Sequence, residues 1–401
     1  MSSNLHFHLV SGIHQALDEI FVGGRYADKV IEKLFKQNRK WGSRDRKFFA
    51  ESVYEIVRHK RLLSYSAQSE DGWQLIAAYL IKSRTEIPDW KEFKNIKVDQ
   101  IQNRLNENKP PEIENSFPDW LNELGYMEFK SEWPEIMKAL NKPAEVFLRA
   151  NTLKSGADEL LKVLRSEEIE AEKVNHEMFQ FPEALRLIKR KNVFVTNAFK
   201  KGLFEVQDAA SQLVAPLLDL KPGLRVADAC AGAGGKSLHI AALMKNKGKV
   251  ISMDIHEWKL KELKTRAARN GVDIIETKVI ESNKTIKRLE NSFDRVLLDV
   301  PCSGMGVIRR NPDTKWKLSA DEIARLCDLQ KEILVHYSKM LKPSGKLVYA
   351  TCSILHRENE EQVKWFLEQE AGKAFKLEKQ LRVWPHRDGF DGFYAAVLTK
   401  G

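Results

Sequence analysis

Two cysteines in this chain each follow an apolar run that predicts a β-strand. Cys302 lies in Asp-Val-Pro-Cys-Ser-Gly (299–304) and Cys352 lies in Tyr-Ala-Thr-Cys-Ser (349–353), while a third apolar run leads into a glycine-rich segment, Asp-Ala-Cys-Ala-Gly-Ala-Gly-Gly-Lys (228–236). A thiolate is a nucleophile, and a glycine turn lets a ligand approach the backbone closely. With the carboxylate of Asp299 beside the first thiol, this combination predicts covalent chemistry on a nucleotide base.

The elements that must position these residues form a strand–helix alternation that begins at Val206. This alternation predicts an α/β, Rossmann-like sheet with parallel strands. Because parallel strands end at one edge of a sheet, Asp299, Cys302, Cys352 and the glycine turn are expected to meet there. The predicted strands are 225–228, 249–254, 274–279, 295–299 and 346–351, with a possible edge strand at 395–399.

The glycine turn differs from two better-known motifs. The dinucleotide pattern G-x-G-x-x-G fits at Gly232 and Gly234 but fails at Ser237, and the P-loop pattern fits at Gly235-Lys236-Ser237 but requires a glycine at Cys230. What remains is a ligand-binding strand–turn–helix, although a plain turn without a ligand is also compatible with the glycines. The next predicted strand ends in Asp254, which is placed to accept hydrogen bonds from ribose hydroxyls. The candidate cofactor-binding residues of the turn are Cys230, Ala231, Gly232, Ala233, Gly234, Gly235 and Lys236.

Composition limits the class of protein. The 401 residues carry a net charge of +10, which favours a phosphate backbone as partner, although a basic enzyme without a polyanion partner stays possible. The 4 cysteines form no C-x-x-C pair, so neither structural zinc nor a disulfide scaffold is expected. Reduced thiols and the lack of a long apolar run predict a cytoplasmic protein with no metal and no membrane span. We also expect a monomer.

The chain is expected to contain three domains. Residues 1–135 read as helical, residues 140–205 as a small α/β subdomain, and residues 206–401 as the Rossmann-like domain. Basic residues recur in the helical part, for example at 36–47, where an RNA-contacting face and an ordinary solvated helix face are both possible.

The motifs resemble those of S-adenosylmethionine-dependent RNA 5-methylcytosine methyltransferases, the family of the bacterial ribosomal RNA enzymes and their nucleolar relatives. The matching segments are 206–211, 228–236, 299–306, 351–353 and the closing Asp-Gly-Phe-Tyr-Ala at 391–395. The segment 148–154 is similar to the start of that family's small RNA-recognition-like subdomain. Residues 1–135 are more weakly similar to an antitermination-factor-type RNA-binding domain.

This resemblance implies a mechanism. Cys352 would add to C6 of a cytosine, Asp299 would hydrogen-bond the base at N3 and N4, and Cys302 would assist release of the product after methyl transfer from S-adenosylmethionine. A base inside a helix is out of reach, so the target would be unpaired or flipped out. The DNA cytosine-5 enzymes use the cysteine of a Pro-Cys motif instead, which would make Cys302 the nucleophile. Thr351-Cys352 favours the RNA arrangement.

Ribosomal RNA is the expected substrate, with transfer RNA as an alternative. A non-catalytic RNA-binding assembly factor is a third possibility. A nucleotide-dependent oxidoreductase or ATPase is disfavoured by the failed glycine spacings. Binding of S-adenosylmethionine, but not of NAD or ATP, would exclude that class.

The sequence also departs from the family pattern. Glu281 or Ser282 stands where relatives have an aspartate for the adenine edge, and Gly232-Ala233 replaces an alanine and a proline in the turn. RNA contacts are expected from Arg149 and Asn151 in the segment 148–154. They are also expected from a basic stretch around Trp316, which could equally be a solvated loop. The candidates in that stretch are Arg309, Arg310 and Lys315.

Overall fold

A computed structural model describes residues 5–401, so the first four residues of the predicted helical domain lie outside it. The chain divides into two compact units. The helical unit contains residues 5–142 and 308–320, and the sheet unit contains residues 143–307 and 321–401. The division into three domains stays a prediction. Across residues 5–401, no helix combines the length and the apolar character that crossing a membrane requires.

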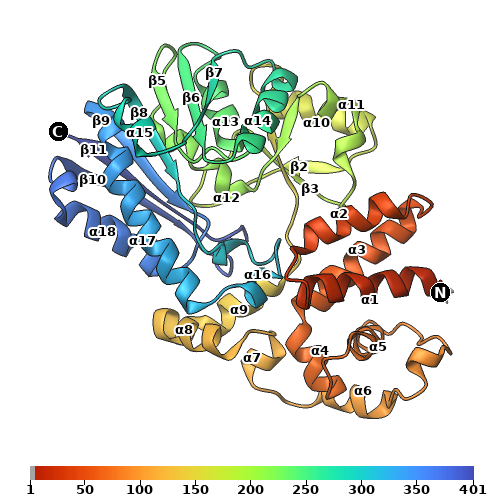
Figure 1. The fold of residues 1–401 in the computed structure, drawn as a ribbon. Helices are drawn as coiled ribbons and strands as arrows, with labels where there is room; N and C mark the ends of the chain where they lie inside the picture. Colours follow the sequence, from red (N-terminus) through yellow and green to blue (C-terminus); the bar gives the residue numbers. More distant parts are fainter. Residues whose placement is uncertain (1–4) are drawn as a thin grey trace. The chain divides into compact units, whose positions relative to one another are not determined.

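The helical unit is built around one apolar core, to which Val10, Phe49, Val53 and Leu75 contribute. These side chains recur at helical spacing within their helices, so most of the helices bury one face. In Figure 1 the helices of residues 5–142 run from red to golden yellow, and α16 (Thr314–Lys317) is drawn in blue. They are α1 (Phe7–Phe21), α2 (Ala27–Gln37), α3 (Ser43–Arg58), α4 (Lys60–Ala67), α5 (Gly72–Lys82), α6 (Val98–Asn106), α7 (Pro111–Glu114), α8 (Asp119–Phe129), α9 (Trp133–Asn141) and the short α16 (Thr314–Lys317).

The segment 308–320 belongs to the helical unit although it follows the Asp299–Gly306 motif in the sequence. Trp316 packs against the core of this unit, and its indole Nε1 donates to the carbonyl of Val57 at 2.7 Å. An aromatic side chain with a satisfied polar atom is a suitable anchor in such a core.

A small four-stranded sheet opens the sheet unit. Its order is β2-β3-β1-β4, and all neighbouring strands are antiparallel. The strands are β1 (Phe147–Ala150), β2 (Ala171–Lys173), β3 (Ala184–Leu187) and β4 (Phe204–Val206), and the helices α10 (Ala157–Ser166) and α11 (Asn197–Lys200) accompany them. Leu148, Leu160, Leu185 and Phe204 form their shared core.

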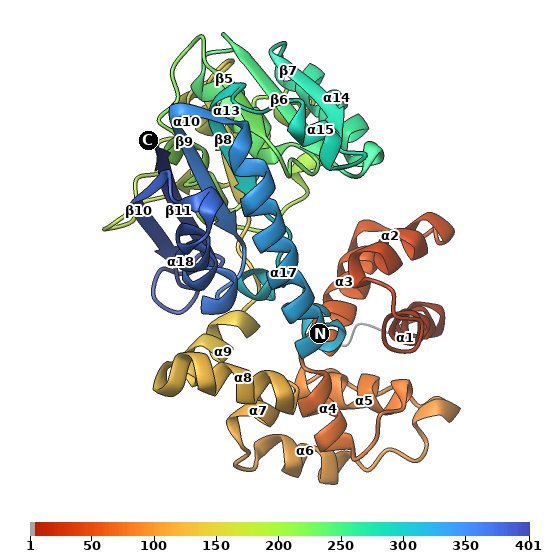
Figure 2. The ribbon, with the colours of Figure 1, turned by 60° about the vertical axis from the view of Figure 1, so that its left-hand side comes forward.

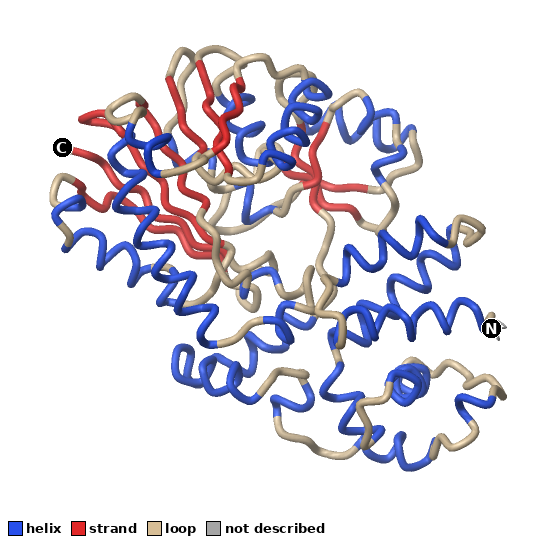
Figure 3. Tube along the Cα trace, viewed as in Figure 1, coloured by secondary structure: helices blue, strands red, loops and turns tan. Residues whose placement is uncertain are grey.

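The large sheet has seven strands in the order β10-β11-β9-β8-β5-β6-β7. The strands from β9 to β7 in that order are parallel, whereas β11 is antiparallel to both of its neighbours. Figure 3 shows these strands side by side in red, with helices in blue around them. The bounds are β5 (Arg225–Asp228), β6 (Lys249–Asp254), β7 (Ile275–Val279), β8 (Phe293–Asp299), β9 (Leu341–Thr351), β10 (Phe375–Val383) and β11 (Phe393–Lys400).

Alternate residues of each strand point to opposite sides of the sheet, so both faces carry apolar side chains. Helices cover both faces. Val226 and Leu297 pack on one side with Ile240 of α13 (Gly235–Leu243). Ala227 and Val296 pack on the other side with helices α17 (Ala320–Tyr337) and α18 (Glu360–Glu368). Figure 2 shows α17 lying along the sheet unit. The remaining helices are α12 (Ala209–Gln212), α14 (Glu257–Asn270) and α15 (Asn283–Lys287).

The expected edge strand at 395–399 lies inside the sheet. It is part of β11, which pairs with β9 on one side and β10 on the other. The sequence analysis did not predict β10, because its charged residues, such as Lys376, Glu378 and Lys379, hide the alternation of a strand. Six of its nine residues fall in the segment Phe-Lys-Leu-Glu-Lys-Gln, which reads equally well as a helix.

Candidate active site

The strand order reverses at β5, and this position defines the crevice of the sheet. The chain runs from β5 to β6 and β7 on one side and then returns to β8 on the other. Ligands of open α/β sheets bind at such a switch point, beyond the carboxyl ends of the strands. Asp228 ends β5 and Asp299 ends β8, so two carboxylates flank the crevice. The sequence predicted this position at the crevice for Asp299 but not for Asp228.

The glycine turn closes one wall of this crevice. Gly232 and Gly234 have φ values of +52° and +85°, a region that favours glycine. A Cβ at Gly234 would lie 2.3 Å from Cγ of Leu263, so this glycine also permits close packing against α14. A Cβ at Gly232 would meet nothing within 4 Å. Open space therefore lies beside the backbone of Gly232, where a ligand can approach it.

Asp254 lies at the carboxyl end of β6 and holds the turn. Its carboxylate accepts from the backbone N–H of Gly232 at 2.9 Å through Oδ2 and from that of His256 at 2.8 Å through Oδ1. Each oxygen still has a second lone pair for a ribose hydroxyl. The next residue, Ile255, is 64% exposed. An exposed apolar side chain beside the carboxylate suits the apolar face of a nucleoside.

Asp228 is fully buried beneath the turn. Its Oδ2 accepts from the hydroxyl of Ser237 at 2.6 Å, whereas its Oδ1 has no hydrogen-bond partner within the described part of the chain. Burial, reinforced by the charges of Asp299 and Asp254, raises the pKa of Asp228 to about 7. The remaining lone pairs of Asp254 suit ribose hydroxyls, and the open space beside Gly232 admits a ligand to the backbone of the turn. These acceptors and the open turn fit S-adenosylmethionine.

Lys236, the last residue of the turn motif, connects it to Asp299. Its ammonium donates to Oδ2 of Asp299 at 2.7 Å and lies 5.0 Å from the centre of the Phe393 ring. Burial alone would lower the pKa of Lys236, but the charge and hydrogen bond of Asp299 outweigh burial and raise it, with a further contribution from Cys352. Lys236 therefore stays charged, and it lies within electrostatic range of the Cys352 sulfur.

The two cysteines that the sequence singled out meet at this edge. Their sulfur atoms are 3.4 Å apart, and both side chains are partly exposed. The contact with Cys352, together with burial, raises the pKa of the Cys302 thiol well above its usual value. Cys230, within the turn, also has a raised pKa because it is buried. Cys302 and Cys230 are therefore protonated thiols at neutral pH.

A buried polar network joins the two cysteine loops. Glu358 accepts from the backbone N–H of Ser303 at 2.8 Å, from its hydroxyl at 2.5 Å and from the amide of Gln330 at 3.1 Å. The hydroxyls of Ser303 and Ser353 lie 3.2 Å apart. The sequence analysis missed Glu358 and Gln330. A glutamate six residues after Cys352 carries no spacing signal of its own, so only the fold identifies it.

The closing Asp-Gly-Phe segment is the third part of this arrangement. The N–H of Gly306 donates to the carbonyl of Cys352 at 2.9 Å, and the N–H of Gly392 donates to the carbonyl of Gly306 at 2.8 Å. A Cβ at Gly306 would lie 2.1 Å from the carbonyl oxygen of Gly392. The backbones approach this closely because both residues are glycines.

Most of the residues expected to bind RNA are buried. Lys315 is completely buried in the helical unit, where its ammonium donates to the carbonyl of Arg58 at 2.8 Å and to Oδ1 of Asn141 at 2.9 Å. The expected surface position of Lys315 was therefore wrong, and Arg309 is likewise buried. Arg310 is partly exposed. The basic residues around Trp316 predicted a surface loop, but Lys315 and Trp316 anchor this segment in the helical unit.

Arg149 and Asn151 are also buried, so neither is a surface contact for RNA. Arg149 donates to the carbonyl of Gly235 at 2.9 Å, and Asn151 donates to the carbonyl of Gly202 at 2.8 Å. Both hold the backbone of the sheet unit. Glu281 is exposed just after β7, and its role toward adenine stays a proposal.

The strand order, with β11 antiparallel, and the ligand-binding turn define a Rossmann-like methyltransferase. Comparisons with known proteins agree. Residues 215–399 match the family described as "16S rRNA methyltransferase RsmB/F", and residues 117–194 match its ferredoxin-like domain. A probable ribosomal RNA small subunit methyltransferase B of Bacillus subtilis is 37% identical over 72% of this chain and 67% of its own length. The corresponding protein of Vibrio vulnificus is also 37% identical, over 71% of this chain and 66% of its own length.

Solved structures show the same fold. The crystal structure of PH0851 covers 100% of both chains with a TM-score of 0.82 and 27% identity. A methyltransferase homologue from Pyrococcus horikoshii has a TM-score of 0.64 and 27% identity, over 73% of this chain and 98% of its own. The chain belongs to the 16S rRNA methyltransferase RsmB/F family. The alignments span about two thirds of the length of these curated relatives.

Proposed function

We propose that this protein transfers a methyl group from S-adenosylmethionine to C5 of an unpaired cytosine in ribosomal RNA. The proposal depends above all on the pair of thiols beside Asp299 and Lys236 at the switch point of the sheet. Membership of an rRNA methyltransferase family supports RNA as the substrate. S-adenosylmethionine, when bound between the glycine turn and Asp254, supplies the methyl group from a positively charged sulfur.

Cys352 is the proposed nucleophile. C5 of cytosine is a weak nucleophile, and addition of a thiolate to C6 turns the ring into an enamine that is nucleophilic at C5. The Cys352 sulfur lies 3.4 Å from that of Cys302, and this contact, together with burial, raises the pKa of Cys302, so Cys302 is the thiol that keeps its proton. The ammonium of Lys236 lies within electrostatic range of Cys352, and a neighbouring cation stabilises a thiolate.

Asp299 binds the base in this proposal. Its Oδ2 is held by Lys236, which leaves Oδ1 for N3 and N4 of the cytosine. Asp299 accepts from N3–H and so stabilises the N3-protonated base, and this protonation withdraws electron density from the ring, so C6 becomes more electrophilic. After C5 accepts the methyl group, the C5 proton passes to water, the electrons of that C–H bond re-form the C5=C6 double bond, and the C6–S bond breaks, which releases the Cys352 thiolate. Cys302, at 3.4 Å from Cys352, assists that release.

A gel assay for the covalent adduct tests the proposal. Wild type, Cys302→Ala and Cys352→Ala would each be incubated with labelled ribosomal RNA and S-adenosylmethionine. We expect a slowly migrating protein–RNA band with Cys302→Ala, in which release is blocked, and no such band with Cys352→Ala. The opposite result would make Cys302 the nucleophile, as in the DNA enzymes.

The absence of a band in every lane, combined with no methyl transfer to ribosomal RNA, would contradict the proposal. Methyl transfer to transfer RNA instead would move the substrate to that class. Tight RNA binding without any methyl transfer would favour a non-catalytic assembly factor. Mass spectrometry of the nucleosides would show whether the methyl group is on C5 of cytosine.

A further inference from the structure

Two arginines hold the backbone of the glycine turn, one on β1 of the small sheet and one on α14, where it pairs with Glu205 of the small sheet. The carbonyl of Ala233 accepts from NH1 of Arg266 at 2.7 Å, and the carbonyl of Gly235 accepts from NH1 of Arg149 at 2.9 Å. Arg149 lies on β1 of the small sheet and Arg266 on α14. Ala233 lies between Gly232 and Gly234, the two residues with positive φ. These bonds therefore fix the most deformable part of the turn.

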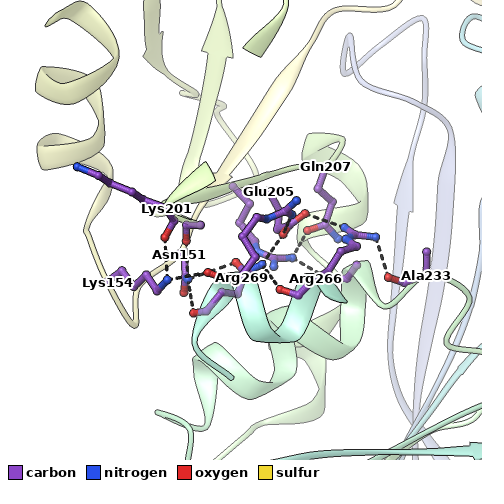
Figure 4. Close-up of polar contacts among 12 residues, drawn as sticks. Asn151, Lys154, Lys201, Glu205, Gln207, Ala233, Arg266 and Arg269 are labelled. Atoms are coloured by element: carbon purple, nitrogen blue, oxygen red, sulfur yellow. Dashed lines mark hydrogen bonds and ion pairs between the residues drawn. The ribbon is translucent and has the colours of Figure 1, made fainter. Parts of the chain in front are cut away.

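Glu205 of the small sheet orients Arg266. Its buried carboxylate accepts from NH2 of Arg266 at 2.8 Å and also from Arg269 and Asn270. Figure 4 shows Glu205 between Arg266 and Arg269, with Arg266 reaching on to Ala233. Burial alone would raise the pKa of Glu205, but its cationic and amide partners outweigh burial and lower it, so the carboxylate stays ionised. Glu205 on β4 lies opposite Arg149 on β1. One position of the small sheet therefore supplies both the direct contact of Arg149 with the turn and the carboxylate that orients Arg266.

A buried cluster of charges contributes little net stability, because removing ions from water offsets most of their attraction. Such a cluster instead orients its side chains, because a planar guanidinium donates hydrogen bonds in fixed directions. Arg266 uses one edge for Glu205 and another nitrogen for Ala233. A rigid contact to a glycine turn has a consequence for ligands, because a preorganised site loses less entropy on binding.

We propose that Arg266, oriented by Glu205, is a positioning residue for S-adenosylmethionine that holds the glycine turn in its binding conformation. The small sheet thereby contributes to the methyl-donor site as well as to the fold. The inference rests on the methyl-donor site of the proposed function. It does not depend on which cysteine attacks or which RNA is methylated.

Arg269 provides a matched control. It pairs with the same carboxylate as Arg266 but makes no hydrogen bond or ion pair with the turn in the described structure, so Arg269→Gln removes a similar ion pair and leaves the Ala233 bond in place. Arg266→Gln removes both. Equilibrium binding of S-adenosylhomocysteine to the full-length protein, without RNA, gives the readout. Backbone hydrogen exchange of the peptide 229–236 reports on the turn directly.

We expect Arg266→Gln to weaken binding about tenfold or more, as for loss of a hydrogen bond from a charged group. Arg269→Gln should weaken it no more than about twofold, the size of a small indirect effect. Exchange of the turn amides should be faster only in Arg266→Gln. In steady-state methylation, KM for S-adenosylmethionine should rise in Arg266→Gln while KM for RNA stays unchanged.

Equal losses in both arginine variants would overturn the proposal, because the cluster would then act through general stability. Unchanged binding in Arg266→Gln would overturn it as well. If Arg266→Gln does not fold, Arg266→Lys decides by the same criteria, since a lysine keeps the charge beside Glu205 but cannot span both partners. Wild-type binding of S-adenosylhomocysteine is the reference in every case. A failure of the cytosine chemistry would appear in the adduct gel and leave this comparison intact.

Discussion

The sulfur atoms of Cys302 and Cys352 lie 3.4 Å apart although 50 residues separate them in the sequence. Each follows a parallel strand, and the strands β8 and β9 are neighbours, so the sheet brings their ends together. The sheet alone does not set the distance between two loop sulfurs. That distance depends on Glu358, which binds Ser303 directly after Cys302, and on Gly306, which donates to the carbonyl of Cys352.

Replacing Glu358 with glutamine should reduce methyl transfer. The carboxylate accepts from three donors on Ser303 and Gln330, and a glutamine amide would turn one of its own donors toward them. We expect kcat to fall about tenfold to a hundredfold, because an unsatisfied buried donor costs roughly 1–3 kcal/mol here. Initial rates of methyl transfer at saturating substrates measure this loss.

The ratio of alkylation rates at Cys302 and Cys352 separates an effect on this site from general instability, because the ratio changes if the loops move or if the pKa of Cys302 falls when the charge of Glu358 is removed. Glu361→Gln, an exposed change at the start of the following helix α18, is the control and should behave as wild type. Normal kcat with an unchanged alkylation ratio in Glu358→Gln would remove the positioning role.

The sequence was sufficient for the parallel strands and for the two thiols that follow them, because an apolar run that ends in turn residues is a strong local signal. Predicted strands 225–228 and 249–254 match β5 and β6 at both ends. The sequence did not indicate β10, the edge strand of the sheet. It was insufficient for residues whose role depends on burial. A lysine beside a tryptophan looks the same whether it faces RNA or, like Lys315, the interior of a helical unit. Arg149 was predicted to contact RNA because it lies in the segment 148–154. Its contact with the carbonyl of Gly235 depends on the three-dimensional fold, which the sequence does not show.

His239 should make the protein sensitive to mild acid. It lies on α13 and its Nε2 contacts Glu183 at 2.8 Å. Burial and the charge of Arg149 lower the pKa of His239 from 6.5 to about 4. A histidine that is neutral in the folded state binds a proton more readily when unfolded. Its contribution to stability is therefore complete above pH ~6.5 and is lost as the pH falls toward 4.

The shift from 6.5 to about 4 corresponds to roughly 3 kcal/mol of unfolding free energy. We expect wild type to lose about this much relative to His239→Gln between pH 7 and pH 4, measured by denaturant unfolding at a series of pH values. Using the difference cancels groups that do not contact His239, such as Asp228, whose raised pKa acts in the opposite direction. Despite its burial, Glu183 has a lowered pKa that depends in part on His239, so the difference reports on the His239–Glu183 pair. A difference that stays constant with pH would contradict the burial of a neutral His239.

Lys315 should stabilise the helical unit without contributing to RNA binding. Its ammonium is fully buried and satisfies the carbonyl of Arg58 and the amide oxygen of Asn141, and burial lowers its pKa well below the usual value. Lys315→Met keeps the length of the side chain but leaves both acceptors without this donor. We expect a loss of about 1–3 kcal/mol in unfolding free energy, as for buried polar groups that lose a partner. The exposed change Lys40→Met is the control and should lie within about 0.5 kcal/mol of wild type.

RNA affinity should be equal in wild type and Lys315→Met at a temperature where both are folded. Its salt dependence should also be the same, because a lysine that contacts no phosphate releases no counterion. A smaller salt slope in Lys315→Met would instead restore the surface role that the sequence suggested.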